Sequence, residues 1–363
     1  MGLGRKHVDN QEVLSSEKIR RLSEVLMAEL RDKIDITVEE LEESLGAVRL
    51  PRFIAESENT FVSRIDSICD EICSDVNKRA VFVSGPTSSG KTTFTLRLSK
   101  TINERGRKAF HLSLDDYYNL KTLKCDKDGR PDFETIDALD VDRIQRDIKT
   151  LIEGGTVVPP FFDFITRTPM EGDPANAICL GDDGVLVVEG LHGLSPRISG
   201  DFDSEQCSKV FIMPYGNVFC DSKIMDSNEI RLLRRIIRDY RHRSAHALAT
   251  IDYWPMIQKS EEKYYEEYLT CADYHVNSFL AYESLIVAPM AMGDIKEALD
   301  KALKGSIEPS VFMEKSPSGK AFADLSAALV KANKLMGHLG KIPVISPDQV
   351  PAESILNEFI SAH

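Results

Sequence analysis

The chain has 363 residues, of which 42% are hydrophobic and 28% charged, so it can bury one large core or two smaller ones. Its formal net charge of −13 argues against a nonspecific nucleic-acid binder, because the chain as a whole repels a phosphate backbone. No apolar run approaches the ~20 residues that cross a bilayer, and the first residues lack the apolar stretch of a signal peptide. Seven scattered cysteines suit a reducing compartment, so we expect a cytoplasmic protein with no membrane or nucleic-acid partner.

Residues 1–79 are expected to form a helical N-terminal extension. Thr37 and Glu40 match a capping box that opens a short helix, which Gly46 ends. Nothing in this segment indicates catalytic chemistry, so its expected role is packing or a partner surface. Its apolar stripes comprise Ile19, Leu22, Leu26 and Leu30, and then Phe61, Ile65, Ile68, Ile72 and Val76.

From residue 80 onward the pattern alternates between strands and helices, as in α/β proteins with a parallel sheet. We expect one main domain over 80–295 and a helical C-terminal appendage over 296–363. The expected strands are 80–84, 108–113, 185–188, 209–213 and 274–277. The expected helices are 91–104, a helix capped by Asp140 and closed by Gly154, 228–243, 255–269 and 321–339. Residues 119–135 are expected to be a loop, and 157–164 a proline-interrupted edge strand or lining segment.

The first of these strands runs directly into a phosphate-binding loop. Gly85, Gly90, Lys91 and Thr92 have the spacing G-x-x-x-x-G-K-[ST]. The glycines let backbone N–H groups point at anionic oxygens, Lys91 adds a cation at the β- and γ-phosphates, and the Thr92 hydroxyl can ligate Mg²⁺. A structural turn is the alternative, but the strand before and the helix after favour a nucleoside triphosphate site. The expected nucleotide contacts are Gly85, Thr87, Ser88, Ser89, Gly90, Lys91, Thr92 and Thr93.

Two further strands end in acidic residues. Asp115 and Asp116 follow one strand, and Glu189 ends another. Because the carboxyl ends of parallel strands line one crevice, we expect these acids beside the loop. One carboxylate can accept the proton of an attacking hydroxyl while another positions a metal ion, whereas a turn or cap role is the alternative. We therefore expect Asp115 to act as a base, with Thr92, Glu189 and Asp115 near the metal.

Six arginines lie close together in the helix expected over 228–243. They are Arg231, Arg234, Arg235, Arg238, Arg241 and Arg243. Guanidinium groups match phosphate oxygens and neutralise charge on a transferred phosphoryl group. A solvated helix face paired with acids is the alternative. In an acidic chain with a phosphate loop, we favour a phosphate-clamping lid over about 228–269.

Taken in order, these motifs resemble the uridine kinase and phosphoribulokinase family of P-loop kinases. The resemblance runs from about residue 79 to 289 and rests on the motifs 85–92, 114–118, 132–139, 188–192 and 231–239. It is nearest to a uridine kinase-like branch that often carries a TGS module, which 1–79 does not resemble. The resemblance implies a P-loop NTPase fold, a mostly parallel sheet flanked by helices. It also implies ATP- and Mg²⁺-dependent phosphorylation of a hydroxyl, which in uridine kinases is the nucleoside 5′-OH.

The resemblance also assigns roles to individual residues. It makes Asp115 the catalytic base, acting with Lys91 and Arg238. Arg238 and Arg243 are expected to hold phosphates, and Glu189 to be the strand-end acid of the second nucleotide motif. The expected acceptor site comprises Asp115, Tyr117, Glu134, Phe162, Arg167 and Arg235.

The acceptor half departs from the family pattern. Glu134 stands where uridine kinases have an aspartate that holds ribose hydroxyls, and Phe162 and Arg167 stand where a tyrosine and a histidine contact the pyrimidine. A pocket that loses its hydrogen bonds to a base discriminates that base poorly. A nucleoside acceptor is thus the family-level expectation. The alternatives are a sugar phosphate, whose anionic group Arg167 would favour if it points into the pocket, a polyol, and a nucleotide-binding regulator without turnover. The sequence also leaves open whether the protein forms a homo-oligomer.

Overall fold

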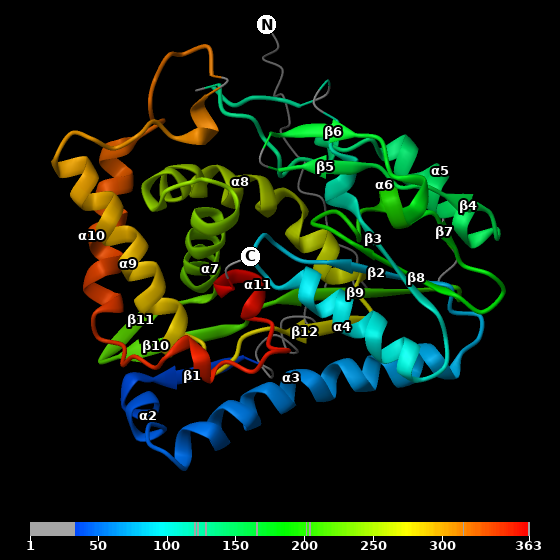
Figure 1. Cartoon of the computed structure of the whole chain (residues 1–363), viewed down its shortest axis with the longest axis horizontal. Helices are drawn as coiled ribbons and strands as arrows, with labels where there is room; N and C mark the ends of the chain where they lie inside the picture. Colours follow the sequence, from blue (N-terminus) through cyan, green and yellow to red (C-terminus); the bar gives the residue numbers. More distant parts are fainter. Residues whose placement is uncertain are drawn as a thin grey trace, which may run out of the picture.

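The computed structural model describes residues 33–361, except 120, 122, 128, 165, 201, 203, 204 and 315. The helical stripe expected from Ile19 to Leu30 lies outside the described residues. A central sheet runs through the described part with helices on both of its faces (Figure 1). Within that part, no helix is long and apolar enough to cross a bilayer.

The central sheet has five parallel strands in the order β12-β9-β2-β8-β3. They are β2 (Ala80–Ser84), β3 (Ala109–Ser113), β8 (Val185–Glu189), β9 (Cys207–Met213) and β12 (Tyr274–Asn277). Every residue of β2 and β8 is buried, as expected for strands covered on both faces. Val81 and Val83 belong to one core cluster, while Ala80 and Phe82 belong to the other, since successive side chains alternate between faces. All five predicted strands are confirmed, as is the α/β class.

Helices cover both faces of the sheet. The α-helices of the described residues are α2 (Val38–Glu43), α3 (Arg49–Ser74), α4 (Lys91–Glu104), α5 (Val141–Ile152), α6 (Pro196–Ser199), α7 (Ser227–His242), α8 (Ala247–Cys271), α9 (Ser284–Leu303), α10 (Leu325–Leu339) and α11 (Asn357–Ile360). Asp140 accepts from the Arg143 N–H and caps α5 as predicted. The predicted start of α8 at 255 is wrong, because Pro255 lies inside the helix and His246 caps it.

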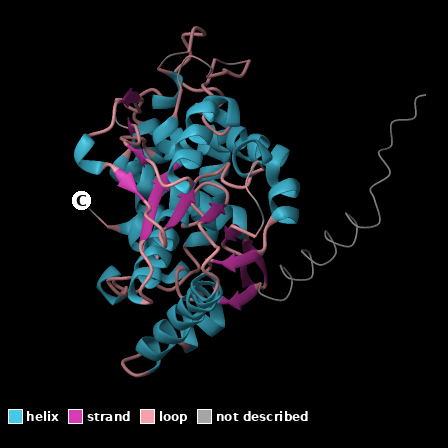
Figure 2. Ribbon diagram, turned by 90° about the vertical axis from the view of Figure 1, so that its right-hand side faces the viewer, coloured by secondary structure: helices cyan, strands magenta, loops and turns pink. Residues whose placement is uncertain are grey.

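A second sheet joins two distant parts of the chain. Its strands are β1 (Ile34–Thr37), β10 (Gly216–Cys220) and β11 (Ser222–Met225), in the order β1-β10-β11. They form a group of their own beside the central sheet (Figure 2). The expectation that 1–79 is purely helical is therefore wrong at β1, whose four residues are too few to show a clear alternation. The capping box of Thr37 and Glu40 is confirmed at the start of α2.

The long helix α3 lies along the central domain and packs against α4 and β12. Four residues of its predicted stripe, Phe61, Ile65, Ile68 and Ile72, are buried. Val76 is not part of the stripe, because the helix ends at Ser74 and Val76 is 75% exposed. The core of α3 is shared with α4 and one face of the sheet, so α3 stabilises the face on which α4 packs.

The segment 157–164 does not form an edge strand of the central sheet. It contributes to two small antiparallel pairs, β4 (Thr156–Val157) with β7 (Ile178–Cys179) and β5 (Phe161–Asp163) with β6 (Thr168–Met170). Prolines at 159 and 160 separate β4 from β5, because proline lacks the N–H that a ladder needs. The alternative expectation of a lining segment is confirmed, since the buried Phe162 faces a cavity described below.

Candidate active site

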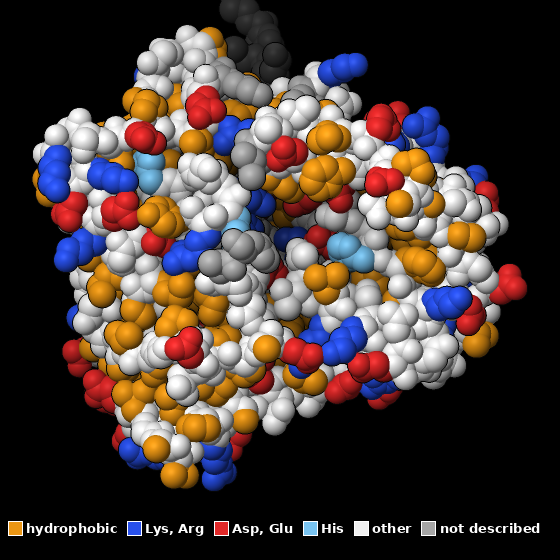
Figure 3. Space-filling view, in the orientation of Figure 1, with side chains coloured by type: hydrophobic (Ala, Val, Ile, Leu, Met, Phe, Trp, Pro, Cys, Tyr) orange, Lys and Arg blue, Asp and Glu red, His pale blue; other side chains and the backbone are white. Residues whose placement is uncertain are grey.

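A cavity of about 220 Å³ lies where β2, β8 and β3 end. The space-filling view shows a hollow at the centre of the face, with Lys, Arg, Asp and Glu side chains gathered around it (Figure 3). The cavity is lined by Thr87, Ser88, Lys91, Thr92, Asp115, Tyr118, Phe133, Glu134, Phe162, Phe164, Arg167, Glu189, Leu191, Arg235, Arg238, Arg243, Tyr253, Phe312 and Glu358. The topology thus brings together most of the residues expected from the sequence, from motifs more than 150 positions apart.

The loop between β2 and α4 requires both of its glycines. Gly90 precedes α4 with φ of +87°, a left-handed conformation that favours glycine. A Cβ on Gly90 would also collide with the side chain of Ile355. Gly85 has no room for a Cβ because the carbonyl oxygen of Ile212, on β9, lies too close. Within this loop geometry, Lys91 donates to the carbonyl of Pro86 at 3.1 Å.

Two arginines of α7 bind this loop from the side that faces away from the cavity. The Nε of Arg231 donates to the Thr87 carbonyl at 3.0 Å, and its Nη2 pairs with Glu261 at 2.5 Å. Glu261 in turn accepts from the Thr87 N–H at 2.8 Å. Arg234 donates to the Ser88 carbonyl at 3.4 Å and is fully buried. The expectation that these arginines belong to a phosphate clamp is wrong for Arg231 and Arg234, whose charges are engaged in the protein core.

Arg235, Arg238 and Arg243 do line the cavity. The Nη1 of Arg235 donates to the Thr87 hydroxyl at 2.8 Å and to Glu134 at 3.2 Å, so it links the loop to the opposite wall.

All three arginines are gathered around the buried Asp239, which the sequence pattern did not single out. Burial opposes ionisation of Asp239, but Arg235 and its neighbours outweigh this effect and lower its pKa to about 2. Burial, together with the nearby Arg238, lowers the pKa of Arg243 to about 10. An internal anion thus holds three cations at one wall.

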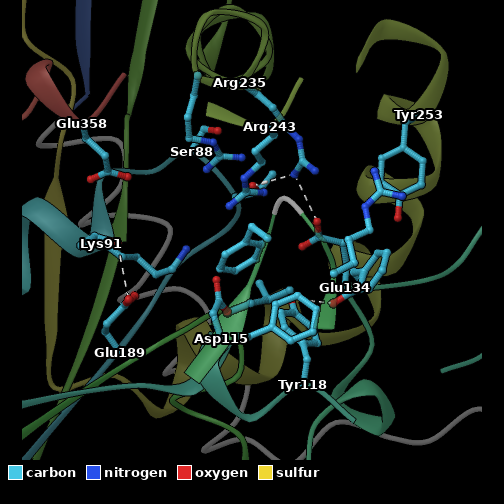
Figure 4. A pocket seen from close by; sticks show the side chains of 18 of the residues that line it. Ser88, Lys91, Asp115, Tyr118, Glu134, Glu189, Arg235, Arg243, Tyr253 and Glu358 are labelled. Carbon is cyan, nitrogen blue, oxygen red and sulfur yellow. Dashed lines mark hydrogen bonds and ion pairs between the residues drawn. The ribbon is translucent and has the colours of Figure 1, made fainter. Parts of the chain in front are cut away.

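Two of the acidic residues, Asp115 and Glu189, lie in the lower part of the close-up, near Lys91 (Figure 4). Burial raises the pKa of Asp115, an effect that the charge of Lys91 opposes. Glu189 accepts from the hydroxyls of Ser113 at 3.1 Å and Thr92 at 3.4 Å. Burial and the neighbouring Asp115 raise the pKa of Glu189 to about 7. Carboxylates and a lysine in one buried space form a site that can hold and move protons.

The remaining wall is aromatic. It is formed by Tyr118, Phe133, Phe162, Phe164, Tyr253 and Phe312. The rings of Tyr253 and Phe312 stack at a centroid distance of 4.2 Å. Arg167 lies over Phe312, with 5.6 Å from its guanidinium carbon to the ring centroid, and donates to the Val311 carbonyl. Arg243 lies over Phe164 at 4.5 Å. This wall offers flat apolar surfaces with cations at its edge.

Tyr117, an expected acceptor contact, does not line the cavity. Its hydroxyl donates to Asp147 at 2.9 Å, and its ring belongs to the core cluster on the other face of the sheet. Tyr118 lines the cavity instead. The chain makes a 3-10 turn over Leu114–Tyr117, so neighbouring residues point in different directions, which a motif match does not resolve.

Four expected nucleotide contacts, Gly85, Ser89, Gly90 and Thr93, belong to the loop and the start of α4 but not to the cavity lining. Thr93 is bound by Glu358 of the C-terminal α11. Neither Glu358 nor Phe312 was expected at the site, because both come from the segment 296–363, where no motif indicated chemistry. Both residues are far from the loop in the sequence, and local sequence patterns do not indicate contacts between such distant segments.

The residues present fit a magnesium ion bound with a nucleotide. Among the described residues no group of three or more His, Cys, Asp or Glu side chains forms a metal site. At nucleotide sites Mg²⁺ is held by one or two protein oxygens, with phosphates and water completing its shell. The Thr92 hydroxyl and the Glu189 carboxylate, 3.4 Å apart, offer that donor set.

A model of the phosphoribulokinase / uridine kinase family matches residues 81–281, which is more than half of the chain. The chain belongs to this family. The match covers the central sheet from Val81 in β2 to the end of β12, and every cavity residue except Phe312 and Glu358. As a member of this family of kinases, the protein has the P-loop fold that its topology displays.

Individual family members are distant. The chain is 25% identical to the uridine kinase of Leuconostoc citreum over 177 residues, which are 47% of this chain and 72% of the relative. It is 28% identical to a probable uridine-cytidine kinase of Caenorhabditis elegans over 119 residues, 29% of this chain and 47% of the relative. A solved structure of a possible uridine kinase from Bacillus stearothermophilus superposes with a TM-score of 0.40 and 20% identity, covering 59% of this chain and 98% of that one.

Proposed function

We propose that this family member is an ATP- and Mg²⁺-dependent kinase that transfers the γ-phosphoryl group to a hydroxyl of a small acceptor. The observation that carries the proposal is the arrangement of one cavity, in which the phosphate loop, Asp115, Glu189 and a cluster of arginines face one another. A structural turn or a solvated arginine helix would not place these groups around one space.

The donor side of this proposal is the loop and α4. Backbone N–H groups of the loop and the positive end of α4 would bind the phosphates, with Lys91 at the β- and γ-oxygens. Thr92 and Glu189 would hold Mg²⁺, which when bound neutralises charge on the phosphates. Arg238 and Arg243 would stabilise the charge on the transferred group, because guanidinium groups match its oxygens.

Asp115 is the proposed base. As the acceptor oxygen bonds to the γ-phosphorus, the bond from that phosphorus to the β–γ bridging oxygen breaks and ADP leaves with the electron pair. The Asp115 carboxylate takes the proton that the acceptor hydroxyl loses. Its buried position supports this role, because burial raises the pKa of Asp115 and so favours proton uptake, while the charge of Lys91 limits that rise.

The aromatic wall supports a nucleoside as the acceptor class. Flat rings such as Tyr118, Phe162 and Tyr253 suit stacking with a planar base. Glu134, which lies between Tyr118 and Tyr253 in Figure 4, suits sugar hydroxyls. A second candidate is an acceptor that already carries a phosphate, such as a sugar phosphate, because Arg167 lines the cavity with its guanidinium over Phe312. A cytoplasmic location and a homo-oligomer stay predictions from the sequence.

Turnover assays test this proposal. Purified protein and Mg-ATP are incubated with nucleosides, sugar phosphates and polyols, and ADP release is measured. We expect one class to stimulate ADP release and Asp115→Asn to lower that turnover by about 10²-fold or more with little change in ATP affinity. Asp116→Asn is the matched control, because its carboxylate accepts from the Phe162 N–H and an asparagine oxygen can do the same. If ATP binds and no acceptor stimulates its turnover, the protein is a nucleotide-binding regulator and the proposal is wrong.

A further inference from the structure

The C-terminal helix α11 places a carboxylate on the first turn of α4. One oxygen of Glu358, Oε2, accepts from the Thr93 N–H at 3.1 Å and from the Thr93 hydroxyl at 3.0 Å. Thr93 is the third residue of α4, so its N–H is one of the amide donors that a helix leaves unbonded at its start. In a phosphate loop these donors, and the hydroxyl beside them, are available to phosphate oxygens.

Glu358 also faces the cavity in which the phosphates would lie. It lines that cavity together with Lys91 and Thr92, and the close-up shows it on the same side as Lys91 and Glu189 (Figure 4). Its charge is one of those that raise the pKa of Glu189, so the two carboxylates interact electrostatically across the site. A bound triphosphate would bring further negative charge into this space. The Glu358 carboxylate already lies there and occupies two donors of Thr93 that phosphate oxygens would use.

The backbone that carries Glu358 is firmly held. Ile355, Leu356 and Phe359 are fully buried, and the Phe359 ring lies under the Arg234 guanidinium at 5.1 Å. Ile355 also packs where a Cβ on Gly90 would lie. The Glu358 side chain itself is only partly buried. It can therefore rotate away from Thr93 while the segment stays docked.

We propose that the Glu358 carboxylate occupies a phosphate subsite of the donor nucleotide and must leave it when the nucleotide binds. The C-terminal segment thereby lowers the affinity of the site for phosphates and raises the nucleotide concentration that is needed to saturate the site. This inference rests on the proposed function, since it requires that the loop bind a nucleotide. It goes beyond that function by making the last residues of the described chain an internal competitor of the substrate.

Binding measurements on full-length variants test the inference. ADP and inorganic tripolyphosphate are titrated by calorimetry into the wild type, Glu358→Ala and Glu358→Gln. We expect Glu358→Ala to bind both ligands at least fivefold more tightly, because the donors of Thr93 become free and a negative charge is lost. Glu358→Gln should lie between the two, since its amide oxygen still accepts from Thr93 without the charge. Tripolyphosphate lacks a base and a sugar, so an effect on both ligands assigns the competition to the phosphates.

Glu353→Ala is the matched control. It removes the same charge from the same segment, but Glu353 pairs with Lys100 at 2.6 Å and with Arg97, outside the cavity lining. Its ligand affinities should equal those of the wild type, and thermal unfolding should show that the variants are folded.

The outcomes separate this inference from the proposed function. If the wild type binds ADP and both Glu358 variants bind it equally or more weakly, Glu358 does not compete and the inference is wrong. If Glu353→Ala increased the affinity for the ligands as much as Glu358→Ala, the inference would also be wrong, because the effect would then come from the overall charge. If neither wild type nor variants bind ADP or tripolyphosphate, the donor site itself is refuted, and the inference with it.

Discussion

Arg231 and Thr87 are joined by a hydrogen bond of 3.0 Å that holds the phosphate loop on the side facing away from the cavity. The carbonyl of Thr87 accepts from the Arg231 guanidinium, and its N–H donates to Glu261, the ion-pair partner of that guanidinium. One buried ion pair therefore fixes both backbone groups of a loop residue. Preorganised loops cost less to order when a ligand binds.

Breaking this pair should destabilise the fold. Arg231→Met leaves Glu261 as an uncompensated buried charge, so we expect a loss of about 3–5 kcal/mol in the free energy of unfolding. The double variant Arg231→Met/Glu261→Leu removes both charges and should be more stable than the single variant. Urea unfolding followed by circular dichroism measures both. A double variant no more stable than Arg231→Met would show that the loss comes from the bonds to the loop and not from the stranded charge.

Two glycines should respond oppositely to the same substitution. Gly85→Ala places a Cβ against the Ile212 carbonyl, so one of two buried backbones must move, and we expect a loss of stability and of nucleotide binding. Gly337 lies within α10, where a Cβ would meet no described atom within 4 Å beyond the helix's own backbone. Gly337→Ala should raise stability by about 0.5–1 kcal/mol, because alanine is the better helix former. Thermal unfolding of the two variants checks the contrast, and equal effects would contradict it.

Acid should weaken the fold through His192. This ring is 2% exposed and bonded to the Tyr268 hydroxyl and the Glu134 carbonyl. Burial lowers its pKa to about 3, whereas an unfolded histidine titrates near 6.5. The unfolded chain therefore binds a proton that the folded chain does not, and stability present above pH 6.5 is lost as the pH falls toward 3.

When the pH falls from 7.5 to 5.0, this one group lowers the free energy of unfolding by about 2 kcal/mol. Urea unfolding at the two pH values should show a smaller loss in His192→Gln than in the wild type by roughly that amount. The difference between the two proteins isolates His192 from the other titrating groups. Identical pH dependence would mean that the ring is protonated in the folded protein.

Arg238 should affect turnover more than folding, if the proposed function holds. Its side chain lines the cavity and pairs with Asp239. Arg238→Gln therefore removes the cation that would stabilise the charge on the transferred phosphoryl group. We expect kcat to fall by about 10²-fold or more, with a smaller change in ATP affinity. Arg241→Gln on the same helix is the control, because Arg241 pairs with Asp294 outside the cavity lining. Equal loss in both variants, measured as ADP release, would point to the helix and not to Arg238.

The sequence predicted the parts of the site that depend on local patterns. The strand β2, the loop and α4 follow one another within 25 residues, and each has its own signal in periodicity or glycine spacing. Asp115 and Glu189 were placed correctly beside the loop, because parallel strands end at one edge of a sheet.

What the sequence did not predict depends on contacts between distant segments. The role of Arg231 is set by Glu261 and Thr87, which a helical wheel does not show. Tyr117 and Tyr118 are adjacent and chemically identical, so the choice between them is made by the turn that carries them. Glu358 reaches Thr93 from 265 positions away, without a motif.

The strand β1 has a consequence for how the chain is made. Ile34 pairs with Gly216, so the edge on which β1 forms does not exist until the chain has grown by a further 182 residues. At ribosomal rates of about 5–20 residues per second, that interval is roughly 10–40 s. Throughout that time the nascent N-terminal strand has exposed backbone donors and acceptors, which is when a chaperone has the greatest access to it.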